Sequence, residues 1–528
     1  MKTNRILYIA AAVLALGTFS ACDKFLDVNP DNRAEANTEK NILKLLTAAY
    51  PTTDISYVLE VMSDNVEHRP SAANSNRFIK QVFDWEDVSE SDDCSPEEIW
   101  NGFYNGIAHS NTALDGIEKL AAKSGWTESL RQAKAEALLI RAYNHFILVN
   151  IFAKHYNKAT AEDDLGITYM KDSESTLIAE YERNTVAEVY QHIDEDLQEA
   201  RPLVGDSNYD VAKYHFNKKA AYAFASKFYL FYEDLDKAIE YADFVLGKNP
   251  SDVLFDFANI KTGANGDFYV ITERYTGVES KANLLLISKN SEWGAMCGPF
   301  TYMHEYCHTY YNARTETRIY SGNQPWGASQ FLMQVGTYTS WKSCFWYVPY
   351  EFEYTDPVNG IGYAHFVQPA VTTHDALFAR AEAKIRKGAE YYDEAIADLN
   401  AWVHAFSSTT TTMTLASIKS YFNGMAYSTW NAGTPKKQLH PSFAIDADGS
   451  DQEVLLQCLL HLHRLDKLHW GDRWFDVKRF GIELYRRELN TGATAATQNT
   501  DDLTVDDPRR AVQIPAKVIA AGYTPNPR

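Results

Sequence analysis

Apolar residues recur every three or four positions over several long stretches of the chain, which predicts amphipathic helices. The first helix begins at Ser95–Glu98, where an N-cap serine, a proline in the first turn and a capping-box glutamate coincide. A second stretch covers Arg131–Tyr156, and a third starts at Thr185, has Glu188 three residues later and runs toward Pro202. These signals predict a mainly α protein.

Two later stretches each predict a helical hairpin, that is, two helices joined by a short polar turn. The first combines Asn217–Leu230 with Asp236–Leu246, and the second combines Ala376–Lys387 with Tyr391–Trp402. Such units are similar to tetratricopeptide repeats, which stack into a superhelix because neighbouring hairpins bury each other's apolar faces. The period is irregular, so an α-helical domain without true repeats remains an alternative of the same fold class.

The helical pattern breaks in the middle of the chain. Fifteen residues of Ser291–Tyr350 are Phe, Trp or Tyr, which is a quarter of this segment against 13% of the whole chain. Gly, Thr, Ser and Asn are also frequent there, and no helical period is sustained. We therefore predict loops and short strands laid over the helical scaffold.

The N-terminus has the pattern of a bacterial lipoprotein signal. Lys2 and Arg5 precede the apolar run Ile6–Leu16, which is too short to span a bilayer. Small residues follow, and the stretch FSAC ends at Cys22, which is similar to a lipobox whose cysteine becomes lipidated. We predict a signal peptide at residues 1–21 and a lipid anchor at Cys22; an ordinary signal peptide with a chance cysteine is the alternative.

Charge narrows the choice of partners. The formal net charge of the 528-residue chain is −20. Binding to nucleic acid depends on clustered positive charge that neutralises phosphates, so this balance argues against a nucleic-acid partner.

The stretch MHEYCH matches H-E-x-x-H, the zinc-protease pattern. On a helix, His304 and His308 would share one face and hold Zn²⁺, while Glu305 would act as general base. The extended pattern would continue with Gly and His where this chain has Tyr311 and Arg314. We interpret the match as chance and keep a zinc-dependent hydrolase as an alternative function.

Two other clusters bear on metal binding. His461, His463 and His469 have spacings that do not bring three imidazoles to one helix face. The stretch Asp446–Asp451 reads DADGSD. A calcium-binding helix–loop–helix requires glycine at the sixth loop position, but here the glycine is fourth, so we predict a solvated turn. The sequence also contains no Walker loop, no dinucleotide fingerprint and no G-x-S-x-G. We predict no catalytic residue, metal or cofactor; paired carboxylates for glycoside cleavage stay open, because in a chain with this many acids no spacing singles any out.

Five stretches, in order along the chain, resemble the SusD/RagB-like nutrient-binding outer-membrane lipoproteins. They are CDKFLDVNPDN (Cys22–Asn32), WNGFYNGIAHSN (Trp100–Asn111), AEALLIRAYNHFILVNIFA (Ala135–Ala153), RLDKLHWGDRWFDVKRFG (Arg464–Gly481) and VQIPAKVIAAGYTPNP (Val512–Pro527). The resemblance implies a tetratricopeptide-like helical scaffold with a loop-rich, irregular ligand-binding region. It also implies a surface-exposed, lipid-anchored position at the outer membrane and a SusC-like, TonB-dependent transporter as partner. The implied task is capture of a glycan, or less often a peptide, without catalysis.

A sugar site can be anticipated from chemistry. The C–H faces of a pyranose stack on aromatic rings, while its hydroxyls need amide, carboxylate or guanidinium partners. The aromatic segment supplies rings, and the family places one side of the ligand face in a loop before the first repeats, here Asp64–Trp85. The candidate ligand residues are therefore Asp64, Asn65, Arg77, Trp85, Trp293, Tyr302, Trp326, Tyr338, Trp341 and Trp346. Trp100 and Trp474 lie at helical spacing in family motifs, and we expect them in the core.

The resulting prediction is a glycan-binding lipoprotein with two regions. Residues 22–250 form an N-terminal helical region, and residues 251–528 a C-terminal region with aromatic-rich loops at 291–350 and further helices at 376–403. The alternatives are the zinc hydrolase and a lid of the transporter that binds no ligand.

Overall fold

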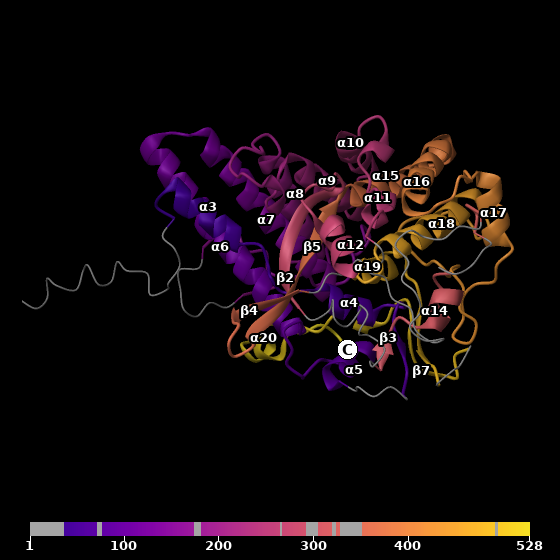
Figure 1. The fold of residues 1–528 in the computed structure, drawn as a ribbon. Helices are drawn as coiled ribbons and strands as arrows, with labels where there is room; N and C mark the ends of the chain where they lie inside the picture. The colour runs from indigo at the N-terminus through magenta and orange to yellow at the C-terminus, as the bar shows by residue number, and fades with distance from the viewer. Residues whose placement is uncertain are drawn as a thin grey trace, which may run out of the picture.

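The computed structural model describes residues 36–70, 76–173, 181–264, 267–291, 305–318, 324–327, 351–490 and 495–528. Helices dominate these residues, so the predicted mainly α class is confirmed. In Figure 1 the helices run in a row from α3 and α6 to α16 and α17, and most strands lie below this row. Within the described residues, no helix is both long and apolar enough to cross a bilayer.

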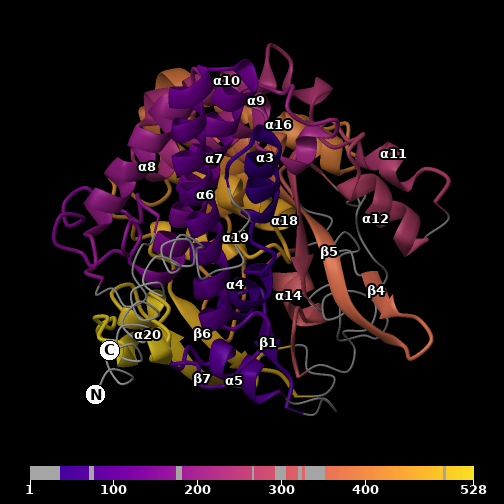
Figure 2. The ribbon, with the colours of Figure 1, turned by 90° about the vertical axis from the view of Figure 1, so that its left-hand side faces the viewer.

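Long helices form the N-terminal part of the row: α3 (Glu39–Ala48), α6 (Pro96–Ser124), α7 (Glu128–Phe152) and α8 (Val186–Ala200). The predicted helix starts are confirmed. The Ser95 hydroxyl accepts a hydrogen bond from the Glu98 amide, and Thr185 forms a capping box with Glu188. Each cap satisfies amide groups that lack a partner inside the helix. Figure 2 shows α3, α6 and α7 side by side.

Both predicted hairpins are present, as α9 (Lys218–Phe231) with α10 (Leu235–Leu246) and α15 (Thr373–Lys387) with α16 (Tyr392–Phe406). Helix α15 packs against α9, α10 and α16, so the two hairpins stack although more than a hundred residues separate them in sequence. Small residues allow this close approach, since Ala376, Ala379 and Ala383 of α15 are all buried. The stack follows the tetratricopeptide-like arrangement that the sequence predicts.

A three-stranded sheet was not predicted. Its order is β2 (Asn283–Asn290), β5 (Ile361–Thr372) and β4 (Glu351–Asp356), and both pairings are antiparallel. The β4–β5 hairpin projects from the body in Figure 2 and exposes Phe352, Tyr354 and Tyr363. Because the outer half of this hairpin is exposed on both faces, it lacks the apolar–polar alternation by which a half-buried strand is found.

A second sheet joins distant parts of the chain in the order β3 (Tyr306–Cys307), β1 (Glu67–His68), β6 (Leu484–Glu488) and β7 (Gln498–Leu503). Strand β1 is therefore paired with strands that lie several hundred residues further along. The segment Asp64–Trp85, predicted as a loop, contains β1 and the short helix α5 (Arg77–Phe83).

The remaining helices are short, apart from α18. They are α4 (Ser56–Met62), η1 (Ala212–Tyr214), η2 (Pro250–Asp252), α11 (Phe257–Lys261), α12 (Phe268–Thr276), α14 (Tyr310–Thr315), η4 (Ala389–Tyr391), α17 (Leu415–Asn423), α18 (Asp451–Asp466), α19 (Asp472–Arg479), η5 (Pro508–Arg510) and α20 (Ala516–Ala520). Trp100 and Trp474 are both buried, as expected.

Candidate functional site

Several predicted ligand residues lie outside the described residues, and the structure says nothing of them. They are Trp293, Tyr302, Tyr338, Trp341 and Trp346, together with the lipidation residue Cys22. The described candidates are Asp64, Asn65, Arg77, Trp85 and Trp326.

Asp64 and Asn65 lie in the protein interior, where they bind buried arginine side chains. The carboxylate of Asp64 accepts two hydrogen bonds from Arg473, at 2.8 and 3.0 Å, and lies 3.2 Å from Arg464. Burial alone would raise the pKa of Asp64, but the cations around it, which include Lys437, hold that pKa well below its ordinary value. Asn65 accepts a hydrogen bond from Arg464 at 2.7 Å. The prediction that these two side chains face a ligand is therefore wrong.

The two described tryptophan candidates are also buried. Trp85 is 3% exposed, its indole N–H donates to the Met62 carbonyl at 3.0 Å, and the guanidinium of Arg486 stacks 3.6 Å from its ring. Trp85 forms part of the wall of a cavity of about 290 Å³ near the C-terminal segment 509–516. Trp326 is fully buried. Neither residue offers an open ring face, which corrects the predicted platform at these positions.

Arg77 is the one described candidate with an exposed side chain. It lies at the start of α5, where its guanidinium is 3.1 Å from the Glu90 carboxylate. This ion pair is exposed and therefore weak, so a ligand could displace it.

The H-E-x-x-H match does not adopt the geometry that zinc proteases use. Tyr306 and Cys307 form strand β3, not a helix, and Glu305 contacts the imidazole of His68 at 2.6 Å. His308 is buried next to Asn312. A helix is what places the motif's two imidazoles on one face, so the described part of this stretch does not form the zinc-protease arrangement.

The other two clusters are explained by local structure. His463 of α18 contacts Asp476 at 2.8 Å, whereas His461 lies beside the ring of Trp326 at 5.9 Å, so these imidazoles do not converge. The stretch Asp446–Asp451 forms the turn before α18, where the Ser450 side chain caps the helix.

The clearest described candidate for a ligand site is a cavity of about 290 Å³ along α6. Helix α6 contributes Trp100, Tyr104, Ile107, Ala108 and Asn111, whose spacing of three or four residues places them on one face. The rest of the lining comes from the chain after α7 and from α20 and the residues after it. These residues are Thr168, Met170, Asp172, Tyr181, Val518 and Tyr523, and Asn105 of α6 completes the rim.

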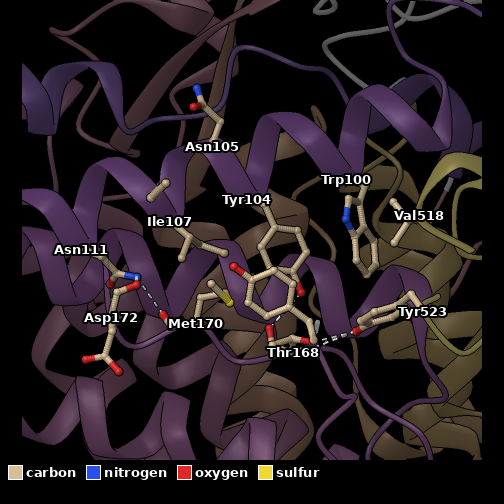
Figure 3. A pocket seen from close by; sticks show the side chains of 12 residues that line it. Trp100, Tyr104, Asn105, Ile107, Asn111, Thr168, Met170, Asp172, Val518 and Tyr523 are labelled. Atoms are coloured by element: carbon tan, nitrogen blue, oxygen red, sulfur yellow. Dashed lines mark hydrogen bonds between the residues drawn. The ribbon is translucent and has the colours of Figure 1, made fainter. Parts of the chain in front are cut away.

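Four of the twelve lining residues are aromatic, and Trp100, Tyr104 and Tyr523 lie close together in Figure 3. The centroids of Trp100 and Tyr104 lie 4.8 Å apart, and those of Trp100 and Tyr523 lie 5.5 Å apart with planes at 76°. Trp100 also packs edge to face on Phe152 behind it. Edge-to-face and tilted contacts of this kind fix the rings relative to one another, so the wall is a preformed surface.

The polar groups inside the cavity are already engaged with each other. The Tyr104 hydroxyl donates to the Thr168 carbonyl at 2.9 Å, and the Tyr523 hydroxyl accepts from the Thr168 amide at 2.9 Å. The Asn111 side chain donates to the carbonyls of Met170 and Asp172. Burial raises the pKa of both phenols, so they stay neutral at physiological pH.

Two polar side chains at the rim, those of Asn105 and Asp172, are exposed to solvent. Asn105 and Asp172 lie at the edge of the group of rings in Figure 3 and are exposed. In the part of the chain that the structure describes, neither the Asn105 amide nor the Asp172 carboxylate has a side-chain hydrogen bond or ion pair. The arrangement therefore presents ring faces inside and one neutral and one anionic group at the opening.

A second layer of contacts holds the cavity wall in place. Arg141 of α7 binds Asp196 of α8 through two hydrogen bonds of 2.8 and 2.7 Å, and the Tyr169 hydroxyl donates to the same carboxylate. His145 accepts a hydrogen bond from the Met170 amide at 3.0 Å. Burial lowers the pKa of His145 well below its ordinary value, so it stays neutral and can accept this bond.

This cavity was not predicted from the sequence. Trp100 was assigned to the core, which is correct, but the same helix face was not extended to Ala108 and Asn111. That spacing was available as a signal. The opposite wall was not, because Tyr523 lies more than 400 residues after Tyr104 in sequence.

A family model for SusD-like proteins, described as "starch-binding associating with outer membrane", matches residues 24–230. Over these residues the chain is similar to the SusD-like family. The match includes the helix that carries the aromatic cavity. No curated protein matches the chain in sequence.

Solved structures share the fold of the chain over nearly its whole length. A candidate sugar binding protein from Bacteroides vulgatus is 17% identical, with a TM-score of 0.64 and coverage of 93% of this chain and 98% of that one. A SusD superfamily protein from Bacteroides thetaiotaomicron is 16% identical, with a TM-score of 0.59 over 93% and 100%. A SusD-like carbohydrate binding protein from Bacteroides vulgatus is 14% identical, with a TM-score of 0.58 over 92% and 96%.

Proposed function

We propose that this SusD-like chain is a cell-surface lipoprotein that captures glycans and delivers oligosaccharides to a SusC-like, TonB-dependent transporter, without cleaving them. The observation that carries the glycan-binding part is the preformed aromatic cavity along α6, in a fold shared with proteins named for sugar or carbohydrate binding. At the opening of the cavity, a ring face suits the C–H face of a sugar, and the Asn105 amide and the Asp172 carboxylate suit its hydroxyls.

We propose the aromatic-rich segment 291–350 as a further ligand face. It supplies Trp293, Tyr302, Tyr338, Trp341 and Trp346, which remain proposed contacts. The exposed guanidinium of Arg77 is a further proposed contact. Because rings tolerate several sugars, the identity of the glycan depends on the polar groups around them.

Binding measurements test the glycan part. The mature chain would be titrated by calorimetry with oligosaccharides from plant, host and microbial polysaccharides, and we expect at least one to bind. Trp341→Ala and Trp346→Ala should each weaken that binding at least fivefold. Trp126→Ala is the matched control, because Trp126 is an exposed tryptophan in the connection between α6 and α7. Binding to no glycan at all would leave only the role of a transporter lid.

Membrane fractionation tests the anchor and the partner. Lipidated Cys22 would hold the protein in the outer-membrane fraction, so Cys22→Ala should release it into the soluble fraction. Detergent extracts of the wild type should contain a large β-barrel protein that copurifies with it. Wild-type protein that stays soluble, or copurifies with no barrel, would contradict this part of the proposal.

Metal analysis tests the alternative of a zinc hydrolase. We expect substoichiometric zinc in the purified protein and no change in glycan length on incubation. Stoichiometric zinc, with cleavage that a chelator stops, would favour the hydrolase.

A further inference from the structure

We propose that the α6 cavity binds an aromatic acyl group carried by the glycan, such as a hydroxycinnamoyl ester, with the sugar chain remaining at the rim. This inference rests on the proposed glycan-binding function and assigns a ligand class to the cavity.

The hydrogen bonds at the cavity floor favour an apolar guest. A pyranose pushed fully inside would bury hydroxyls, and a buried hydroxyl without a partner loses its hydration and gains nothing. The Tyr104 and Tyr523 hydroxyls and the Asn111 amide are already bound to Thr168, Met170 and Asp172. The floor therefore suits a group that needs no hydrogen bonds.

The size and shape of the cavity fit one aromatic ring. An apolar protein cavity of about 150 Å³ holds a benzene molecule. The α6 cavity has about twice that volume, about 290 Å³, which accommodates one aromatic ring with a short side chain. Its wall presents the rings of Trp100, Tyr104 and Tyr523, with Met170 beside them (Figure 3). Aromatic guests gain edge-to-face and sulfur contacts on such a wall.

The two polar groups at the rim suit an ester of a sugar. The Asn105 amide can donate a hydrogen bond to an ester carbonyl at the opening, and the Asp172 carboxylate can accept one from a sugar hydroxyl. Asp172 is exposed and anionic, so it disfavours a ligand that carries its own carboxylate at the opening. The occupant is therefore a neutral ester and not the corresponding free acid.

The test uses methyl 4-hydroxycinnamate as the ester probe and 4-hydroxycinnamate as the acid probe, with the mature chain observed by saturation-transfer NMR and calorimetry. We expect the ester to bind at least tenfold more tightly than the acid. Asp172→Asn should narrow this difference at least threefold, because it removes the repelling charge. An acid that binds as well as the ester would overturn the assignment.

Ala108→Phe locates the binding. Ala108 lines the cavity from α6, so a phenyl group there fills the space and should weaken ester binding at least tenfold. Ala122→Phe is the matched control, because Ala122 is an exposed alanine of the same helix. Asn105→Ala changes only an exposed side chain and should weaken ester binding about threefold, so the proposal stays testable if Ala108→Phe does not fold.

Other outcomes separate this inference from the proposed function. If glycans bind but the ester does not, or if Ala108→Phe leaves ester binding unchanged, the aromatic-ester site is wrong and glycan capture stands. If Ala108→Phe instead abolishes copurification with the transporter while ester binding persists, the cavity receives a side chain of that protein. If no glycan binds in any form, both proposals fail.

Discussion

Replacing Asp64 with asparagine should destabilise the protein by several kcal/mol. Asp64 lies in a buried cluster in which Arg473, Arg464 and Lys437 surround its carboxylate, and Glu316 also pairs with Arg464 and Lys437. The neutral amide of asparagine keeps the size of the side chain but removes one of the two carboxylate charges that balance these cations. It can accept hydrogen bonds at only one of its two terminal atoms, whereas Arg473 now donates to both oxygens.

The magnitude follows from the contacts. A hydrogen bond to a charged group is worth about 1.5–3 kcal/mol, and breaking a buried ion pair by removing one partner costs about 3–5 kcal/mol. We expect Asp64→Asn to lie near 3–5 kcal/mol. With an unfolding entropy of about 2.1 cal/mol/K per residue, a chain of this length has about 1 kcal/mol/K in total, so the thermal midpoint should fall by about 3–5 °C.

The assay is thermal unfolding of the mature chain followed by circular dichroism, with Asp115→Asn as control. Asp115 is an exposed aspartate on α6 whose substitution should leave the midpoint within about 0.5 °C. The same variants would be titrated with the glycan that the wild type binds. If Asp64→Asn keeps the wild-type midpoint and loses glycan affinity selectively, Asp64 contacts ligand and the structural role described above is refuted.

Two further predictions concern a buried histidine and two glycines. Burial lowers the pKa of His461 to about 3. Below about pH 6.5 the unfolded chain therefore binds a proton at this residue that the folded chain does not bind, so the free energy of unfolding falls as pH falls. From pH 7 to pH 5 this lowers the free energy of unfolding by about 2 kcal/mol. In denaturant titrations at several pH values, His461→Leu should remove that part of the pH dependence. If the free energy of unfolding of the variant has the same pH dependence as that of the wild type, His461 is protonated in the folded protein. Gly471→Ala should destabilise the protein by about 1–3 kcal/mol more than Gly125→Ala. Both glycines have positive φ, but an added methyl group at Gly471 would lie 2.9 Å from the Cβ of Leu59, whereas no atom lies within 4 Å of such a group at Gly125. Equal unfolding midpoints for the two variants would contradict this account.

The helices could be predicted because their signals are local. The caps at Ser95 and Thr185 act within four residues, and the hairpins α9–α10 and α15–α16 carry their apolar faces in their own sequence. The β4–β5 hairpin was missed because its outer half has no buried face, so no alternation marks it.

The site was harder to predict, because burial depends on partners far away in sequence. Asp64 and Asn65 are polar and follow a short helix, which suits a ligand loop equally well. Arg464 and Arg473, about 400 residues later, turn them into interior residues. The α6 cavity depends in the same way on Tyr523. A single sequence does not show which of its polar residues such distant partners will cover.

The four-stranded sheet has a consequence for how quickly the protein folds. Strand β1 lies between β3 and β6 in this sheet. It can form its strand pairs only after the chain near residues 306 and 488 has come close to it. Bringing such distant segments together lowers the conformational entropy of the chain before any stabilising contact forms, and this slows folding. The helical hairpins can form early from local contacts, whereas the sheet and the Asp64 cluster should close last. We expect refolding kinetics with a fast helical phase and a slow phase that restores the interior.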